Sequence, residues 1–137
     1  MRICIDSNQF IFGITGADSA AERLLLLLPH LEVLVPRLVL IEVTRNLHSL
    51  EVTSLYALLN KAPKFRIVDE PVPRSLVLKY VDLGLREKGD AFIGAFAEWQ
   101  QLDYLISENR HFLAELQTTA FAVLTPSAFL HLLSSTA

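Results

Sequence analysis

The sequence has 137 residues, of which 52% are hydrophobic and 20% are charged. This length and composition predict one globular domain over residues 1–137 and argue against disorder. The net charge of −3 and the pI near 5.8 lack the basic footprint that phosphate binding normally leaves. A bound divalent metal or a local basic rim can still carry that attraction.

The only cysteine, Cys4, lies in the first apolar segment, so no disulfide framework within the chain is expected. The chain begins with a strand-like segment instead of a signal sequence. Its longest leucine run, Leu24 to Leu28, stops at Pro29 and is too short to span a bilayer. We therefore expect a cytoplasmic protein with no membrane association.

Short apolar segments alternate with helical ones along the first half of the chain. The first strand runs straight into Asp6, and a glycine-containing turn is expected at Gly13 and Gly16. A helix is predicted from Asp18–Ser19, because Glu22 in its first turn favours a helix start. The elements that follow are a strand over 31–35, a helix that opens at Pro36 and ends at 48–50, and a helical stretch over about 52–61.

The second half repeats this alternation. The predicted elements are a strand over 65–68, a helix over 74–83, an apolar helix headed by Gly89–Asp90, a strand over 104–106, a short helical segment over 110–116, a strand over 121–124, a helix over 126–133 and a frayed tail over 134–137. Strands that alternate with helices in this way predict an α/β fold, with a parallel sheet covered on both faces.

Four polar positions stand where this fold would bring them to one edge. Asp6 ends the first strand and is followed by Ser7 and Asn8, but it could equally cap a helix or close an Asx turn. Glu42 interrupts the apolar run 38–43, although a surface pair with Arg45 one turn later is the alternative.

The other two positions lie in the second half of the chain. Asp90 heads the apolar helix, where aspartate is also a favoured cap residue. Asn109 ends the strand over 104–106, after Ser107 and Glu108, and could simply turn the chain and cap the next helical segment.

The combination is more informative than any single position. Clustered carboxylates repel one another and need a cation at neutral pH. Ligands that are all oxygen select a hard metal such as Mg²⁺ or Mn²⁺, which can activate water and stabilise an in-line displacement at phosphorus.

These segments resemble the PIN-domain nucleases, and among them the small single-domain VapC-type toxins. The matching segments follow the family's order and span nearly the whole chain: 3–8 (Ile-Cys-Ile-Asp-Ser-Asn), 35–36 (Val-Pro), 41–43 (Ile-Glu-Val), 89–93 (Gly-Asp-Ala-Phe-Ile) and 105–112 (Leu-Ile-Ser-Glu-Asn-Arg-His-Phe). The resemblance implies a three-layer α/β/α fold with a central parallel sheet of about five strands. It also implies metal-dependent cleavage of RNA, a homodimer and an antitoxin partner.

The resemblance also implies roles for individual residues. Asp6, Glu42 and Asp90 match the family's three main acidic positions, which bind Mg²⁺ or Mn²⁺, and Asn109 matches the fourth catalytic position. Ser7 matches a hydroxyl residue that supports the first aspartate. Because an amide carries no charge, Asn109 should weaken the hold on a second metal, which leaves occupancy by one or two ions open.

Further residues extend this interpretation. Asn8 and Ser107 are expected to support the site, and Arg45 and Arg110 are the basic residues best placed to contact RNA phosphates. Arg37, Arg86 and Lys88 are weaker candidates for the same role.

Two alternatives remain. One is a PIN-fold module that is weakly active or inactive and serves in binding or regulation. The other is a phosphatase of the haloacid-dehalogenase type, which needs a second carboxylate two residues after the nucleophile, where this chain has Asn8.

Overall fold

The computed structural model describes residues 1–135, except for the side chain of Lys88. Five parallel strands form one sheet in the order β3-β2-β1-β4-β5. The strands are β1 (Arg2–Ile5), β2 (Glu32–Pro36), β3 (Phe65–Val68), β4 (Tyr104–Ile106) and β5 (Ala122–Leu124). The predicted α/β/α architecture with about five parallel strands is confirmed.

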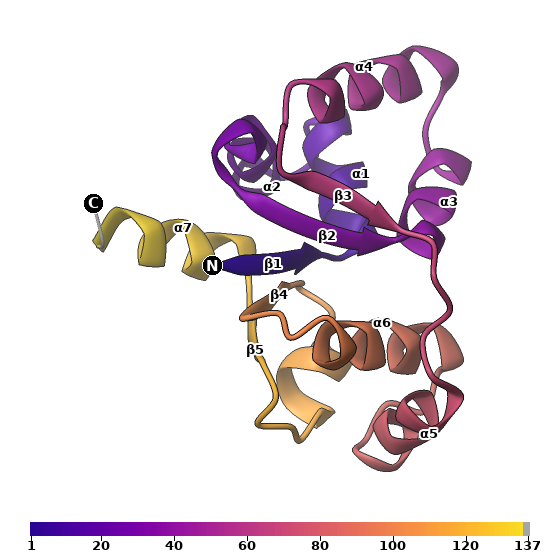
Figure 1. Ribbon diagram of the computed structural model, residues 1–137. Coiled ribbons are helices and arrows are strands. Elements are labelled where there is room, and N and C mark those ends of the chain that lie inside the picture. The colour runs from indigo at the N-terminus through magenta and orange to yellow at the C-terminus, as the bar shows by residue number, and fades with distance from the viewer. Residues whose placement is uncertain (136–137) are drawn as a thin grey trace.

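Helices lie on both sides of this sheet. In Figure 1, α1 to α4 lie above the strands, α5 and α6 lie below them, and α7 lies near the N-terminus. Their bounds are α1 (Ser7–Thr15), α2 (Ser19–Leu26), η1 (Leu28–His30), α3 (Arg37–Arg45), α4 (Ser49–Asn60), α5 (Arg74–Asp82), α6 (Lys88–Trp99), η2 (His111–Glu115) and α7 (Pro126–Ser135). Within residues 1–135, no helix is long and apolar enough to cross a bilayer.

The central strand β1 explains the composition of the core. Ile3, Cys4 and Ile5 are buried because β1 has β2 on one side, β4 on the other and helices over both faces. Such doubly covered strands are apolar at every position instead of alternating. Cys4 is a free, buried thiol, and burial raises its pKa, so it packs as a small apolar residue.

Helix α1 was not predicted. The segment after Asp6 is helical through Thr15, and Gly13 lies inside the helix rather than in the expected turn. A side chain at Gly13 would collide with Leu25 and with the carbonyl oxygen of Ala21, so glycine lets α1 and α2 approach closely. The turn comes at Gly16, which has φ of 75° and caps the helix.

Several helix boundaries also differ from the prediction. Pro36 is both the last residue of β2 and the N-cap of α3, so the helix opens there as predicted, but α3 stops at Arg45, short of 48–50. His48 and Glu51 form a capping box, which starts α4 three residues before the expected 52. The prediction of a frayed tail is wrong for Ser134 and Ser135, which belong to α7, and residues 136–137 lie outside the described part of the chain.

Candidate active site

Asp6 lies at the carboxyl end of β1, and both of its carboxylate oxygens are held. Oδ1 accepts a hydrogen bond from the backbone N–H of Ser7 at 2.8 Å, so Asp6 is the N-cap of α1. Oδ2 accepts a hydrogen bond from Oγ of Ser107 at 2.8 Å. The backbone N–H of Asp6 donates to the carbonyl oxygen of Ile106 at 3.0 Å, which aligns the ends of β1 and β4. The capping role considered from the sequence is therefore real.

The electrostatic environment of Asp6 links it to two other carboxylates. Burial raises its pKa most strongly, and the hydrogen bonds from Ser107 and Ser7 oppose that shift. The negative charges of Asp90 and Glu42 raise the pKa further. Asp90 and Glu42 therefore lie close enough for their negative charges to disfavour ionisation of Asp6.

Glu42 is joined to the same edge through Ser7. Oγ of Ser7 donates to Oε2 of Glu42 at 2.8 Å, and Ser7 is only 4% exposed. The expected support of the first aspartate by the Ser7 hydroxyl is not observed: the hydroxyl binds Glu42, and only the Ser7 amide binds Asp6. Within residues 1–135, Glu42 forms no ion pair with Arg45, so the alternative of a surface pair is not realised.

Asp90, the third of these carboxylates, lies in the first turn of α6. The N-cap of this helix is Glu87, so the interpretation of Asp90 as the cap is wrong. Burial is the main cause that raises the pKa of Asp90, and a hydrogen bond from Asn109 and the nearby His111 oppose it. The charges of Glu87 and Glu42 raise the pKa further.

Asn109 presents its amide nitrogen to the site. Its Oδ1 accepts a hydrogen bond from the backbone N–H of His111 at 2.9 Å, and this bond fixes which end of the amide is the oxygen. Nδ2 then donates to Oδ1 of Asp90 at 3.3 Å. The sequence suggested that this amide would offer a neutral oxygen, but the oxygen is already engaged with the backbone.

Ser107 connects the pieces of this edge. It is fully buried, and its Oγ donates to Asp6 while it accepts a hydrogen bond from the backbone N–H of Asn109 at 3.0 Å. Its own backbone N–H donates to the carbonyl oxygen of Leu124 at 2.9 Å, which ties the site to β5. The predicted supporting role of Ser107 agrees with these contacts, whereas Asn8 is exposed.

His111 is a neighbour whose role the sequence did not reveal. Its Nδ1 lies 2.7 Å from Oε2 of Glu115, one helical turn later. Glu115 is the main cause that raises the pKa of His111, and Asp90 and Glu87 add to it. The only available signal was the His–Glu spacing of four residues, which is common on solvated helix faces.

A family model for the PIN domain matches residues 3–116 of this chain. The chain belongs to the PIN domain family. Comparison with curated protein sequences finds no match.

Solved structures share the fold of this PIN domain at low sequence identity. A toxin–antitoxin complex from Klebsiella pneumoniae is 17% identical, with a TM-score of 0.63 over 90% of this chain and 97% of that chain. VapBC2 from Rickettsia felis, bound to a DNA fragment from its promoter, is also 17% identical, with a TM-score of 0.60 over 91% of this chain and 98% of that chain. At this identity the likeness establishes the fold.

PIN nucleases generally use divalent metals, and the donor chemistry of this edge fits such an ion. Asp6, Glu42 and Asp90 supply oxygen ligands only. Burial is the main cause that raises the pKa values of the two aspartates, and a cation would relieve the repulsion from neighbouring carboxylates that adds to it. Within residues 1–135, however, no three His, Cys, Asp or Glu side chains are grouped closely enough to hold a metal ion. Mg²⁺ usually keeps several waters and binds one or two carboxylates, so a complete cage is not required.

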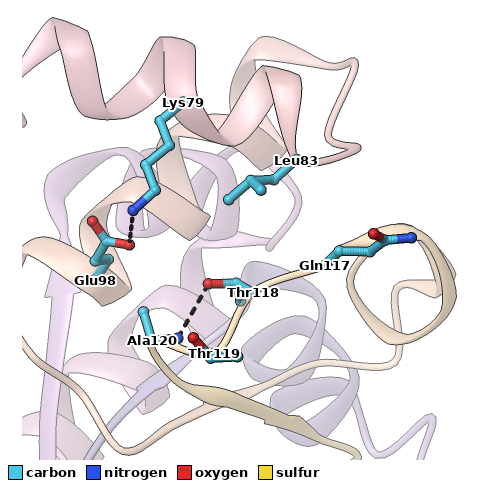
Figure 2. Close-up of a pocket in the computed structure, with 7 residues that line it drawn as sticks. All are labelled: Lys79, Leu83, Glu98, Gln117, Thr118, Thr119 and Ala120. Atoms are coloured by element: carbon cyan, nitrogen blue, oxygen red, sulfur yellow. Dashed lines mark hydrogen bonds and ion pairs between the residues drawn. The ribbon is translucent and has the colours of Figure 1, made fainter.

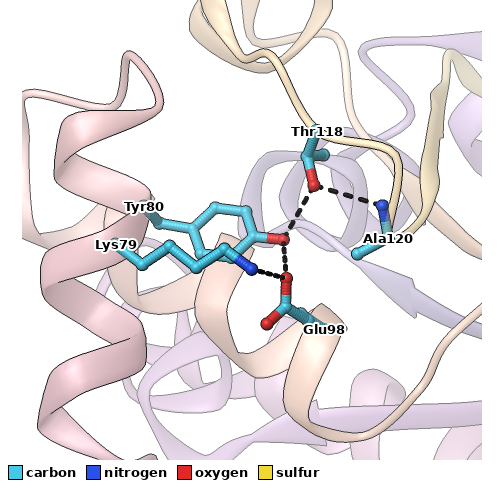
Figure 3. Close-up of polar contacts among 5 residues, drawn as sticks. All are labelled: Lys79, Tyr80, Glu98, Thr118 and Ala120. Atoms are coloured by element: carbon cyan, nitrogen blue, oxygen red, sulfur yellow. Dashed lines mark hydrogen bonds and ion pairs between the residues drawn. The ribbon is translucent and has the colours of Figure 1, made fainter.

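A separate hollow of this PIN domain lies near the other end of α6. It has a volume of ≈ 510 Å³ and lies between Lys79 and Leu83 of α5 and the loop 117–120 (Figure 2). Tyr80, which is fully buried, places its hydroxyl 3.0 Å from both Oε1 of Glu98 and Oγ1 of Thr118 (Figure 3). The edge of the sheet that carries Asp6 contributes no residue to this hollow, so the hollow is not the candidate active site.

Proposed function

We propose that this PIN domain is a Mg²⁺- or Mn²⁺-dependent ribonuclease that hydrolyses RNA phosphodiester bonds. The single observation that carries the proposal is that hydrogen bonds hold Asp6, Glu42 and Asp90 at the carboxyl edge of a parallel sheet, from Ser107, Ser7 and Asn109 respectively. Ligands of open α/β sheets bind at this edge. Repelling carboxylates gain stability from a cation, and such a cation can activate water and stabilise charge at a phosphodiester.

In this proposal, Asp6, Glu42 and Asp90 hold the metal. A bound ion would supply charge stabilisation at the phosphate and activation of the attacking water. Ser107 orients Asp6, and Ser7 orients Glu42, through hydrogen bonds of 2.8 Å each. Such outer partners fix the direction in which a ligand points.

Asn109, at the fourth position, acts through Asp90, and two arginines contact the substrate. Asn109 donates to Asp90 and so positions its carboxylate, while its neutral amide leaves the site with one charge fewer than an aspartate would. Arg45, at the end of the helix that carries Glu42, and Arg110, next to Asn109 in the sequence, are exposed, and we assign them to phosphate contacts.

The biological context of the proposal is a toxin–antitoxin pair. The solved structures that share this fold include a toxin–antitoxin complex and a VapBC2 assembly. By analogy, we propose that this chain is the toxin, acts in the cytoplasm, forms a homodimer and is held inactive by an antitoxin protein.

The test is cleavage of single-stranded RNA with Mn²⁺ or Mg²⁺ and with EDTA. The amide variants Asp6→Asn, Glu42→Gln and Asp90→Asn should each lower the rate about 100-fold or more while the fold is retained, because each weakens the hold on the metal that would stabilise charge at the phosphate. Glu22→Gln, which removes an exposed carboxylate on α2, is the matched control and should cut at the wild-type rate. Cleavage by Asp90→Asn at the wild-type rate would remove Asp90 from the site.

The second candidate is a PIN-fold module of weak or no activity that binds or regulates. The absence of a preassembled group of three ligands in residues 1–135, together with the amide at position 109, favours it. Metal-dependent cleavage that Asp6→Asn abolishes would exclude it. Expression of the isolated chain separates the toxin assignment: growth arrest by wild type but not by Asp6→Asn supports it, and normal growth with both contradicts it.

A further inference from the structure

A second hollow adjoins the candidate active site. It has a volume of ≈ 490 Å³ and is lined by Gly84, Arg86, His111, Ala114, Glu115 and Gln117. One wall is the turn between α5 and α6, and the other is the segment from η2 to Gln117. We call this hollow the Arg86–His111 pocket.

The two walls of this pocket are fixed to each other. The backbone N–H of Gln117 donates to the carbonyl oxygen of Leu83 at 3.1 Å. Gly84 has φ of 119°, and a side chain there would collide with the carbonyl oxygen of Glu115. Only glycine allows this approach, so the pocket has a defined width before any ligand enters.

The pocket opens beside Asp90. His111 lines it and is joined to Asp90 through Asn109: the backbone N–H of His111 donates to Oδ1 of Asn109 at 2.9 Å, and Nδ2 of Asn109 donates to Oδ1 of Asp90 at 3.3 Å. A strand of nucleic acid with one phosphate at the carboxylate edge therefore has its next nucleotide within reach of the pocket.

The charges around the pocket favour an anion. The Glu115 carboxylate is paired with His111, and its pKa is lowered first by His111 and further by Arg110 and Arg86, so both arginines lie near it. Within the described residues, the guanidinium groups of Arg86 and Arg110 form no hydrogen bond or ion pair. Asp90 and Glu87 are the opposing charges on this side. Two unpaired cations thus remain near the pocket, in a protein whose net charge is negative.

The lining also suits a nucleobase. Imidazole rings and guanidinium planes are surfaces on which unstacked bases stack, and a side-chain amide such as that of Gln117 can donate to and accept from a base edge. A volume of ≈ 490 Å³ lies in the range of small-molecule sites.

The hollow beside Lys79 lacks these properties. The ammonium group of Lys79 is 2.8 Å from Oε1 of Glu98 and is therefore neutralised (Figures 2 and 3). A neighbouring hollow that shares Glu98 also contains Asp103. Neither of these hollows offers an unpaired cation to a phosphate.

We propose that the Arg86–His111 pocket binds the nucleotide next to the bond that is cut, with its base against His111 or Arg86 and its phosphates against Arg86 and Arg110. This assignment rests on the proposed RNA cleavage for its functional meaning. It predicts binding of single-stranded RNA whether or not the chain can cut.

The experiment measures binding of a fluorescein-labelled single-stranded RNA of about eight nucleotides to the Asp6→Asn protein, by anisotropy at several salt concentrations in EDTA. Adding Arg86→Ala or Arg110→Ala should weaken binding about fivefold at ~0.1 M salt. Each should also make the negative slope of log K against log[salt] shallower by about 0.7, the value for one phosphate contact to a single strand. Lys64→Ala is the matched control, because it removes an exposed cation just before β3, at the opposite edge of the sheet.

A second arm separates base binding from general attraction to phosphate. Gln117→Ala leaves the charge unchanged, and in the metal-loaded, otherwise wild-type enzyme it should alter which positions of an RNA are cut. His111→Ala should raise KM more than it lowers kcat.

The experiment distinguishes failure of the pocket assignment from failure of the nuclease assignment. If both arginine variants bind RNA like Lys64→Ala, or if the Asp6→Asn protein binds no RNA, the pocket assignment is wrong even where the wild type cuts RNA. If the arginine variants lose affinity but the wild type does not cut, the pocket stands and the nuclease assignment falls.

Discussion

Oγ of Ser107 lies 2.8 Å from Oδ2 of Asp6, across 101 residues of sequence. The same oxygen accepts the backbone N–H of Asn109, so one buried hydroxyl aligns the ends of β1 and β4 and the start of the next turn. In the proposed site, this hydroxyl determines where the first carboxylate points.

Ser107→Ala should therefore weaken both the fold and the metal site. Loss of a buried hydrogen bond to a charged group costs about 1.5–3 kcal/mol, and loss of an outer partner lowers metal affinity about 10–100-fold. Urea unfolding and calorimetric titration with Mn²⁺ measure the two effects. Ser134→Ala, which removes an exposed hydroxyl from α7, is the control and should change neither. Wild-type Mn²⁺ affinity in Ser107→Ala would contradict the role of this hydroxyl.

Asn109→Asp should make the chain more dependent on metal. The variant replaces a donor to Asp90 with a second carboxylate, so the metal-free protein should lose stability at neutral pH, and Mn²⁺ should bind more tightly. Asn109→Ala separates the two causes, because it removes the donor without adding charge and should not tighten binding. Calorimetry that gives equal or weaker Mn²⁺ affinity for Asn109→Asp would place residue 109 outside the site.

Asp6→Asn should stabilise the metal-free protein at neutral pH. Burial raises the folded-state pKa of Asp6 above its ordinary value of 3.8, so ionising this group destabilises the fold. The penalty is absent below the ordinary pKa and fully present above the raised one, and asparagine caps α1 as well as aspartate does. Urea unfolding in EDTA should show Asp6→Asn more stable than wild type at pH 7, with a difference that disappears as the pH falls toward 3.8. A less stable Asp6→Asn at pH 7 would contradict this account.

Two glycines at either end of one turn should respond in opposite ways to substitution by alanine. Gly84→Ala forces a side chain into a left-handed backbone against Glu115 and should cost about 2 kcal/mol or more. Gly89 lies in α6, and an added Cβ there meets nothing within 4 Å, so Gly89→Ala should stabilise by up to about 1 kcal/mol. Thermal unfolding of both variants checks this, and similar melting temperatures would mean that the Gly84 contact is unimportant.

The parallel sheet was predictable because its strands are short, apolar at every position and separated by helices. Asp6, Glu42, Asp90 and Asn109 could be proposed as a set because two strand ends, one helix head and one charged residue in an apolar run are visible in the sequence, and their role in a metal site stays a prediction. The directions of the side chains were not predictable. The Ser7 hydroxyl binds Glu42, a partner remote in sequence. The Asn109 nitrogen points into the site because a backbone N–H already binds the Asn109 oxygen.

Helix α1 was missed for a related reason. Gly13 is costly in a helix by intrinsic propensity, but the close approach of Leu25 and Ala21 in α2 more than offsets that cost. Arg86 and His111 likewise belong to a pocket that exists only because Gly84 meets Glu115 across 31 residues of sequence, a contact that no local pattern announces.

The position of β1 in the middle of the sheet has a consequence for folding. β1 pairs with β4, and Asp6 accepts its hydrogen bond from Ser107 across 101 residues of sequence. Asp6 is therefore held in place only after β4 has paired with β1. The proposed site is therefore assembled only when two distant parts of the chain have met, so it cannot exist in a partly folded domain.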